Sequence, residues 1–179
     1  AFERESDLKH EYINGEIFAM TGASRFHNLI CVNVITTLRN QAKSKGCTVY
    51  PADMRLRIQA TGEHTYPDVS MLCGESHFAE NIFDSLINPS LIIEVLSPST
   101  ERYDRGKKFQ IYRKIETFKE YVLISQDSPH IEHYALNPAG KWELSDVIGL
   151  DKSLKLLSVD CTLDMAEVYD LVIFPDKSN

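Results

Sequence analysis

Two acidic residues near the middle of the chain have the surroundings expected of catalytic groups. Glu94 lies inside the aliphatic run LIIEVL, residues 91–96, and Asp68 follows Pro67 at the start of another apolar segment. A carboxylate among aliphatic side chains loses hydration, which only a cation or hydrogen-bond donors restore. The alternatives are an ordinary buried ion pair or the wet face of an edge strand for Glu94, and a turn or cap for Asp68.

Acids at the ends of two neighbouring strands can converge on one point and bind a hard cation there. Mg²⁺ prefers oxygen ligands and takes one or two carboxylates, with waters and substrate phosphate completing its coordination. Such a cation orients a water molecule, lowers its pKa and stabilises charge on a phosphate. We therefore predict that Asp68 and Glu94 bind Mg²⁺ or Mn²⁺.

A predicted helix after the Glu94 strand supplies a cation and a hydroxyl group. Apolar residues at helical spacing indicate a helix over about residues 104–114. Lys108 and Tyr112 are four residues apart and share one face of it, whereas Lys107 points about a quarter-turn away. We expect Lys108 to stabilise developing negative charge, and Tyr112 to support Lys108 or contact the substrate. The alternative is that Lys108 is a plain surface lysine.

Turn signals and periodicity predict the elements that position these residues. Asn14-Gly15 indicates a hairpin over residues 12–20, although a helix end followed by one strand also fits. A helix is predicted over about 27–43, with Ser24 as N-cap and Gly46 as stop signal. His27, at its start, is either a metal or phosphate contact or an ordinary surface residue. Helices alternating with strand-like segments predict a mixed α/β chain with one central sheet, forming a single domain over residues 1–179.

Composition and charge limit the class of protein. The chain has 179 residues, 43% hydrophobic and 25% charged, as in soluble globular proteins. It lacks an apolar run of ~20 residues and a signal-peptide pattern, so we expect no membrane partner and a cytoplasmic location. The net charge of −7 argues against coating nucleic acid by bulk electrostatics, but a local site that binds divalent cations can still hold a phosphodiester.

The cysteines carry no metal-binding pattern. They lie at positions 31, 47, 73 and 161, without the close pairs of a zinc site. We expect all of them to be reduced thiols, as in a cytoplasmic protein.

Several longer motifs make the chain resemble a known family. They are YPDVS (66–70), IEVLSPST (93–100), YDRGKKFxxY (103–112) and EY (120–121), preceded by KHEYxNGEIxxM (9–20). Together they resemble the Uma2 family of the PD-(D/E)xK nuclease superfamily, from about residue 5 to 170. The resemblance implies a restriction-endonuclease-like fold, in which helices flank a central mixed β-sheet and an N-terminal β-hairpin precedes it. It also implies metal-dependent hydrolysis of DNA.

The same resemblance assigns roles to individual residues. Asp68 matches the acid of the "PD" half and Glu94 that of the "(D/E)xK" half, but the second residue after Glu94 is Leu96 rather than lysine. In the family the ammonium group comes from the following helix instead, which implies Lys108. Glu16 matches an acid that many members carry in an early element, and so implies a third carboxylate. An exposed hairpin glutamate is the alternative.

We therefore expect a metal-dependent DNA endonuclease, and a homodimer, because nuclease folds that cut both strands often pair. Two alternatives stay open. One is a nuclease-fold module that binds nucleic acid or regulates, with weak or no catalysis, which Leu96 and the acidic charge favour. The other is a hydrolase of a different phosphoester. Nucleotide-binding glycine loops and the Gly-x-Ser-x-Gly elbow do not occur in the sequence.

Overall fold

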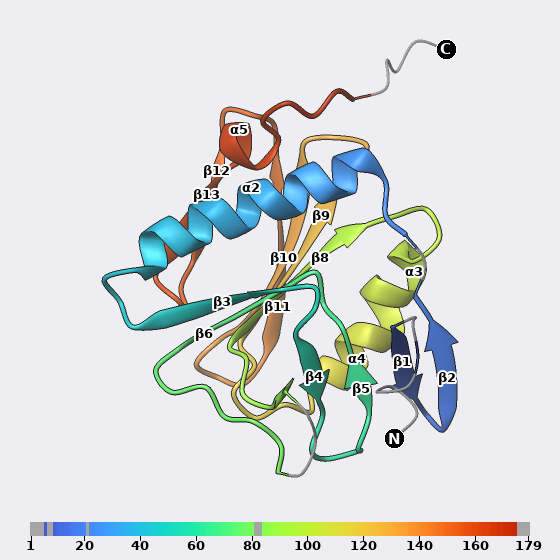
Figure 1. Ribbon diagram of the computed structural model, residues 1–179. Coiled ribbons are helices and arrows are strands. Elements are labelled where there is room, and N and C mark those ends of the chain that lie inside the picture. Colours follow the sequence, from blue (N-terminus) through green and yellow to red (C-terminus); the bar gives the residue numbers. More distant parts are fainter. Residues whose placement is uncertain (1–5, 7–8, 21, 81–83, 175–179) are drawn as a thin grey trace.

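A six-stranded mixed sheet forms the centre of the computed structural model, which describes residues 6, 9–20, 22–80 and 84–174 (Figure 1). Its strands are ordered β11-β10-β9-β8-β6-β3, and only the β8–β9 pair is parallel among them. They comprise β3 (Cys47–Pro51), β6 (Val69–Cys73), β8 (Leu91–Leu96), β9 (Glu120–Ser125), β10 (His130–Leu136) and β11 (Trp142–Ile148). The predicted central mixed sheet is confirmed.

One face of this sheet is covered by the long helix α2 (Arg25–Ala42), which crosses the front of Figure 1. The helix buries Ile30, Val34, Leu38 and Ala42, a row at i, i+4 spacing, in the core that also contains Ile93 of β8. At its start the Ser24 side chain accepts a hydrogen bond from the backbone N–H of His27, so the predicted N-cap is confirmed.

The opposite face packs against a helical segment in three parts. These are α3 (Glu101–Tyr103), the π-helical turn η1 (Asp104–Lys108) and α4 (Phe109–Tyr112). The predicted helix over 104–114 therefore begins earlier and ends earlier, and its middle is wider than an α-helix. Such π turns are rare and occur often at functional sites.

A smaller sheet with the order β2-β1-β5-β4-β7 lies beside α4 in Figure 1. It contains β1 (His10–Ile13), β2 (Glu16–Ala19), β4 (Arg55–Arg57), β5 (His64–Thr65) and β7 (Ser85–Leu86). β1 and β2 form the predicted N-terminal hairpin, with Asn14 and Gly15 at positive φ of 50° and 85°. A two-residue turn with both φ values positive matches the twist of the strands it joins, which is why Asn-Gly suits this position.

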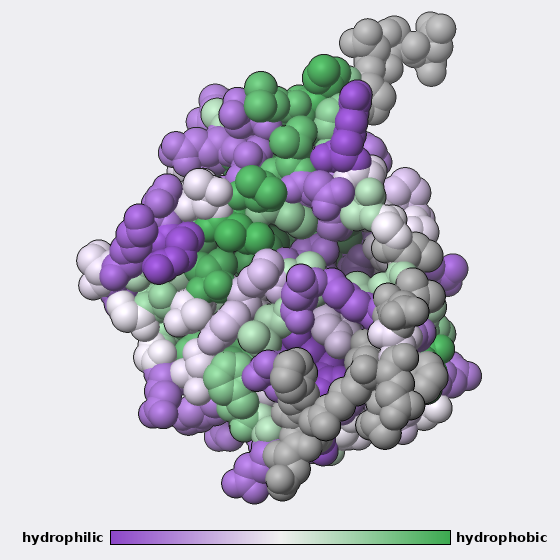
Figure 2. All heavy atoms as spheres, in the orientation of Figure 1, coloured by the Kyte–Doolittle hydropathy of each residue, from purple (hydrophilic) through white to green (hydrophobic). Residues whose placement is uncertain are grey.

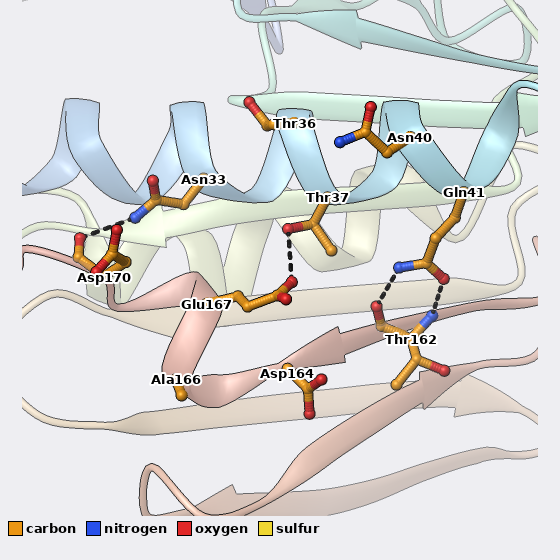
Figure 3. A pocket seen from close by; sticks show the side chains of 10 residues that line it. All are labelled: Asn33, Thr36, Thr37, Asn40, Gln41, Thr162, Asp164, Ala166, Glu167 and Asp170. Carbon is orange, nitrogen blue, oxygen red and sulfur yellow. Dashed lines mark hydrogen bonds between the residues drawn. The ribbon is translucent and has the colours of Figure 1, made fainter.

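The C-terminal elements extend the core under α2. The hairpin of β12 (Ser153–Leu156) and β13 (Cys161–Asp164) leads into the short helix α5 (Met165–Val168). A polar groove separates α2 from β13 and α5, and side chains bridge it (Figure 3). The Gln41 amide exchanges two hydrogen bonds with the backbone of Thr162, and Thr37 donates to Glu167. Hydrogen bonds across the groove thus connect the C-terminal elements to α2.

A hydrophobic band on the surface runs over α2 towards the C-terminal segment (Figure 2). Exposed apolar residues of these two segments include Val32, Leu171 and Ile173. No helix in the described ranges combines the length and apolar character that membrane crossing requires.

The structure corrects the prediction that every cysteine is a free thiol. Cys47 of β3 and Cys73 of β6 are directly opposite in the strand register and form a disulfide, whereas Cys31 and Cys161 are free. The two partners are 26 residues apart in sequence. Because only the pairing of β3 with β6 brings them together, their spacing carried no signal.

Candidate active site

Strand alternation directs Glu94 towards the helical segment. Within β8, the neighbours Ile93 and Val95 face the α2 side, so Glu94 points to the other face of the sheet. There its Oε1 accepts hydrogen bonds from Lys108 Nζ and from the Tyr112 hydroxyl, each at 2.9 Å. Only 3% of Glu94 is exposed, and these donors compensate its lost hydration.

Asp68 lies next to Glu94, just before β6 begins. The backbone N–H of Asp68 donates to Glu94 Oε2 at 3.2 Å, and the N–H of Val95 donates to Asp68 Oδ2 at 2.8 Å. These reciprocal contacts hold the two carboxyl groups side by side where β6 and β8 meet. The Asp68 side chain remains 16% exposed, so it is the more accessible of the two acids.

Lys108 comes from the π-helical turn η1 and is almost fully buried. Besides Glu94, its Nζ lies 3.5 Å from Glu11 Oε1 and 3.5 Å from Asp104 Oδ1. Burial alone would lower the pKa of this ammonium group, but the carboxylates of Glu94, Glu11 and Asp104 raise it well above its usual value. Lys108 therefore stays protonated and supplies a fixed positive charge.

Glu11 of β1 is the third carboxylate near Lys108, and sequence reasoning missed it. Glu11 lies on the same buried face of β1 as Ile13; it accepts hydrogen bonds from the Tyr66 N–H at 3.2 Å and the Tyr103 hydroxyl at 3.3 Å. Glu16, for which a third-carboxylate role was one expectation, is exposed on the edge strand β2, where all four residues are exposed. The structure thus brings Glu11 to the cluster and leaves Glu16 in the alternative position of an exposed hairpin residue.

His27 and Cys31 approach Asp68 from α2. His27 Nε2 lies 3.1 Å from Asp68 Oδ2, and its Nδ1 lies 3.6 Å from Cys31 Sγ. The two residues are four apart, so they share one face of the helix. Burial, together with the charges of Asp68 and Glu94, raises the pKa of the Cys31 thiol, which stays protonated when free. The sequence singled out His27 but offered no signal for Cys31.

Carboxyl groups outnumber ammonium groups in the cluster. Three carboxyl groups, those of Glu94, Glu11 and Asp104, lie within 3.5 Å of the Lys108 ammonium, and Asp68 adjoins Glu94. Burial raises the pKa of Glu94 well above its usual value; Lys108 opposes this shift, while Asp68 and Asp104 add to it. A divalent cation would relieve this repulsion, and oxygen donors of this kind are the ligands that Mg²⁺ and Mn²⁺ accept. The donor set therefore fits a hard metal ion.

The chain is similar to several known proteins. A model of the Uma2 family, described as "Putative restriction endonuclease", matches residues 1–166. Two proteins of Synechocystis sp., "Uncharacterized protein slr1290" and "Uncharacterized protein sll1609", are 35% and 36% identical to this chain. The matches cover 94% and 82% of this chain and 87% and 83% of theirs.

A solved structure has the same fold. The crystal structure of "a putative nuclease belonging to DUF820" from Anabaena variabilis matches with a TM-score of 0.75 and 19% identity, over 94% of each chain. This likeness confirms the expected mixed α+β fold of the restriction-endonuclease-like type. Since the family model covers most of the sequence and includes every residue of the acidic cluster, the chain belongs to the Uma2 family.

Proposed function

We propose that this protein is a metal-dependent endonuclease that hydrolyses DNA phosphodiester bonds, with Asp68, Glu94 and Lys108 as its catalytic residues. The observation that carries the proposal is the convergence of these three residues: Lys108 Nζ lies 2.9 Å from Glu94, and hydrogen bonds to the backbone tie Asp68 to the same strand. Membership of the Uma2 family, whose model is described as "Putative restriction endonuclease", supports a nuclease.

Asp68 and Glu94 are the residues that would hold Mg²⁺ or Mn²⁺. When bound, such a cation polarises the phosphate and lowers the pKa of a water molecule. Asp68 is oriented for this role by the Val95 N–H and by His27. The backbone N–H of Asp68 orients Glu94 in turn, so neither carboxyl group must reorganise when substrate arrives.

Lys108 provides a permanent positive charge beside the reacting phosphate. Because its pKa is raised, it is not a base; it stabilises the negative charge that develops on the phosphate oxygens. Tyr112 holds Glu94 Oε1, and burial raises the pKa of its hydroxyl well above the usual value, so Tyr112 remains a donor. Its role is to position Glu94 rather than to contact the substrate.

A plasmid-cleavage assay with Mg²⁺ or Mn²⁺ tests the proposal. Asp68→Asn and Glu94→Gln each remove a ligand charge with little change of shape, and we expect cleavage to fall about 100-fold or more. Glu16→Gln is the matched control, since this exposed hairpin glutamate should leave cleavage unchanged. Equal cleavage by all four proteins would identify a contaminant and end the proposal.

A homodimer is the second part of the proposal. One site cuts one strand, so cutting both strands of a duplex calls for two sites. Sedimentation velocity at several protein concentrations should show a dimer, and a monomer at all concentrations would remove this part.

A nuclease-fold module that binds nucleic acid without cutting it is the competing function. The observation that favours it is that Lys108 and Tyr112 already occupy Glu94 Oε1. Calorimetric titration with Mn²⁺ separates the two functions. The endonuclease binds Mn²⁺ and loses that binding in Asp68→Asn, whereas the non-catalytic module does not take up the ion.

A further inference from the structure

A second set of donor atoms adjoins Asp68 on the side that faces α2. His27, Cys31 and Asp68 each offer one ligand atom, and these three atoms lie within 4.8 Å of one another. They are an imidazole nitrogen, a sulfur and a carboxylate oxygen. Glu94 and Lys108, in contrast, meet on the face of the sheet that carries the helical segment 101–112.

The chemistry of this set differs from that of the carboxylates. Thiolate and imidazole ligands suit Zn²⁺ and other thiophilic ions, whereas Mg²⁺ prefers oxygen alone. Three protein ligands with a fourth position open to water are the usual composition of an accessible zinc site. Cys31 is only partly buried, so an ion can reach it.

The spacing is close to what tetrahedral coordination needs. Bonds of about 2.0–2.3 Å to zinc place neighbouring ligand atoms roughly 3.3–3.7 Å apart. The structure has His27 Nδ1 3.6 Å from Cys31 Sγ and His27 Nε2 3.1 Å from Asp68 Oδ2. These two distances involve different nitrogens of the His27 ring, whereas one ion binds only one of them. A movement of about 1 Å by the Cys31 or His27 side chain would bring all three ligand atoms to the spacing of a tetrahedral ion.

We propose that His27, Cys31 and Asp68 bind a thiophilic divalent cation such as Zn²⁺, and that this ion competes with the hard metal for Asp68. Binding replaces the S–H bond of Cys31 with a metal–sulfur bond and releases that proton to solvent. The binding stands by itself, whereas the competition rests on the proposed endonuclease function. The consequence of the competition is that Zn²⁺ inhibits DNA cleavage, because it occupies the Asp68 carboxylate that the reaction needs.

Cobalt absorption tests the binding directly, because a thiolate bound to Co²⁺ gives a charge-transfer band in the near ultraviolet. The band should appear when Co²⁺ is added to the wild-type protein with the Cys47–Cys73 disulfide intact, and it should disappear on addition of Zn²⁺. Cys31→Ser should lose the band and weaken Zn²⁺ binding by about tenfold or more. Cys161→Ser is the matched control, because Cys161 lies in β13 and its thiol contacts the backbone of Val159.

Two results would overturn the site: no band in the wild-type protein, or a band that persists in Cys31→Ser. His27→Gln gives a second test should Cys31→Ser fail to fold, and thermal melting shows which variants are folded. The band should be retained in Glu94→Gln, since Glu94 is not a ligand of this ion. Loss of the band in that variant would contradict a site separate from the Glu94 carboxylate.

The cleavage assay then separates this inference from the proposed function. With Mg²⁺ present, Zn²⁺ should inhibit the wild-type protein, and inhibition of Cys31→Ser should need about tenfold more Zn²⁺. A cobalt band without any DNA cleavage supports the site and defeats the endonuclease. Equal inhibition of both proteins would defeat the competition while leaving the endonuclease intact.

Discussion

At the scale of single residues, the cluster is organised around one oxygen atom. Glu94 Oε1 accepts hydrogen bonds from both Lys108 and Tyr112, while Oε2 accepts from the backbone of Asp68. Donors of this kind favour the charged form of a carboxyl group, and burial favours the neutral form. Burial has the larger effect on Glu94, whose pKa is raised, so each donor matters to the pH at which the carboxylate forms.

Tyr112→Phe should therefore shift the pH dependence of DNA cleavage. Loss of the hydroxyl removes a donor to the ionised form and raises the pKa of Glu94 further. Since the proposed reaction needs the carboxylate, the acid limb of the kcat/KM profile should move to higher pH. Activity should fall most at low pH and recover as the pH rises.

Tyr134→Phe is the matched control, because the Tyr134 hydroxyl contacts Glu132 and not the cluster. Its profile should coincide with that of the wild-type protein. If Tyr112→Phe lowered the rate equally at every pH, Tyr112 would not act through ionisation of Glu94.

At the scale of elements, the side chains of the site come from a strand, a hairpin and a helical turn, and the geometry of each element sets where its side chains point. Alternation along β8 sends Glu94 to one face of the sheet, and the hairpin β1–β2 adds Glu11. The π turn η1 carries both Asp104 and Lys108, whose side chains meet at 3.5 Å. The first strand after this helical segment, β9, begins with another buried acid, Glu120.

Glu120 joins β9 to the loop between β12 and β13. It accepts hydrogen bonds from His133 Nε2 at 3.0 Å and from the N–H groups of Leu157 and Ser158 at 3.1 and 2.7 Å. Burial opposes ionisation, but the hydrogen bonds from His133 and Ser158 outweigh it and lower the pKa of Glu120. These hydrogen bonds thus stabilise the fold at pH values at which Glu120 is ionised.

Glu120→Gln should destabilise the protein by about 2 kcal/mol at pH 7, since hydrogen bonds to a charged group are lost. A lowered folded-state pKa gives stability that is present above the unfolded pKa, about 4.3, and lost as pH falls through the folded value. The difference between the two proteins in urea denaturation should thus shrink steadily below about pH 4. A difference that is constant with pH would show that packing, not charge, is responsible.

At the scale of the whole molecule, the candidate site lies where the two sheets, α2 and the helical segment 101–112 meet. The two faces of the large sheet have separate cores, and β8 contributes to both. The Cys47–Cys73 disulfide joins β3 and β6 at the end of the ladder away from Val69, the residue after Asp68. It secures the edge of the sheet rather than the acidic cluster.

Reduction of this disulfide should lower the free energy of unfolding by about 3 kcal/mol, because the bond restricts an unfolded loop of 26 residues. Urea denaturation with and without a thiol reductant measures the difference, and a thiol count confirms reduction. A Cys47→Ser/Cys73→Ser protein should be insensitive to the reductant. Identical midpoints for oxidised and reduced wild-type protein would contradict the prediction.

Much of the fold was predictable from the sequence, since turn chemistry and periodicity are local. Asn14-Gly15 predicted the hairpin, the apolar spacing after Ser24 predicted α2, and the aliphatic run around Glu94 predicted a strand. The predicted bounds of the helix after Glu94 were less accurate. A π turn depends on how the helix packs, and the four-residue spacing of Asp104 and Lys108 does not reveal it.

By itself, the sequence identified the family motifs and, from their local surroundings, the acids Glu94 and Asp68. Helical spacing and the family resemblance singled out Lys108 and Tyr112. Only the tertiary structure decided that Glu11, not Glu16, joins Lys108, and that Cys31 lies beside His27 and Asp68. The reason is physical. Which of two hairpin faces turns inward, and which strands pair, depend on contacts between segments far apart in the chain, and no spacing along one segment encodes them.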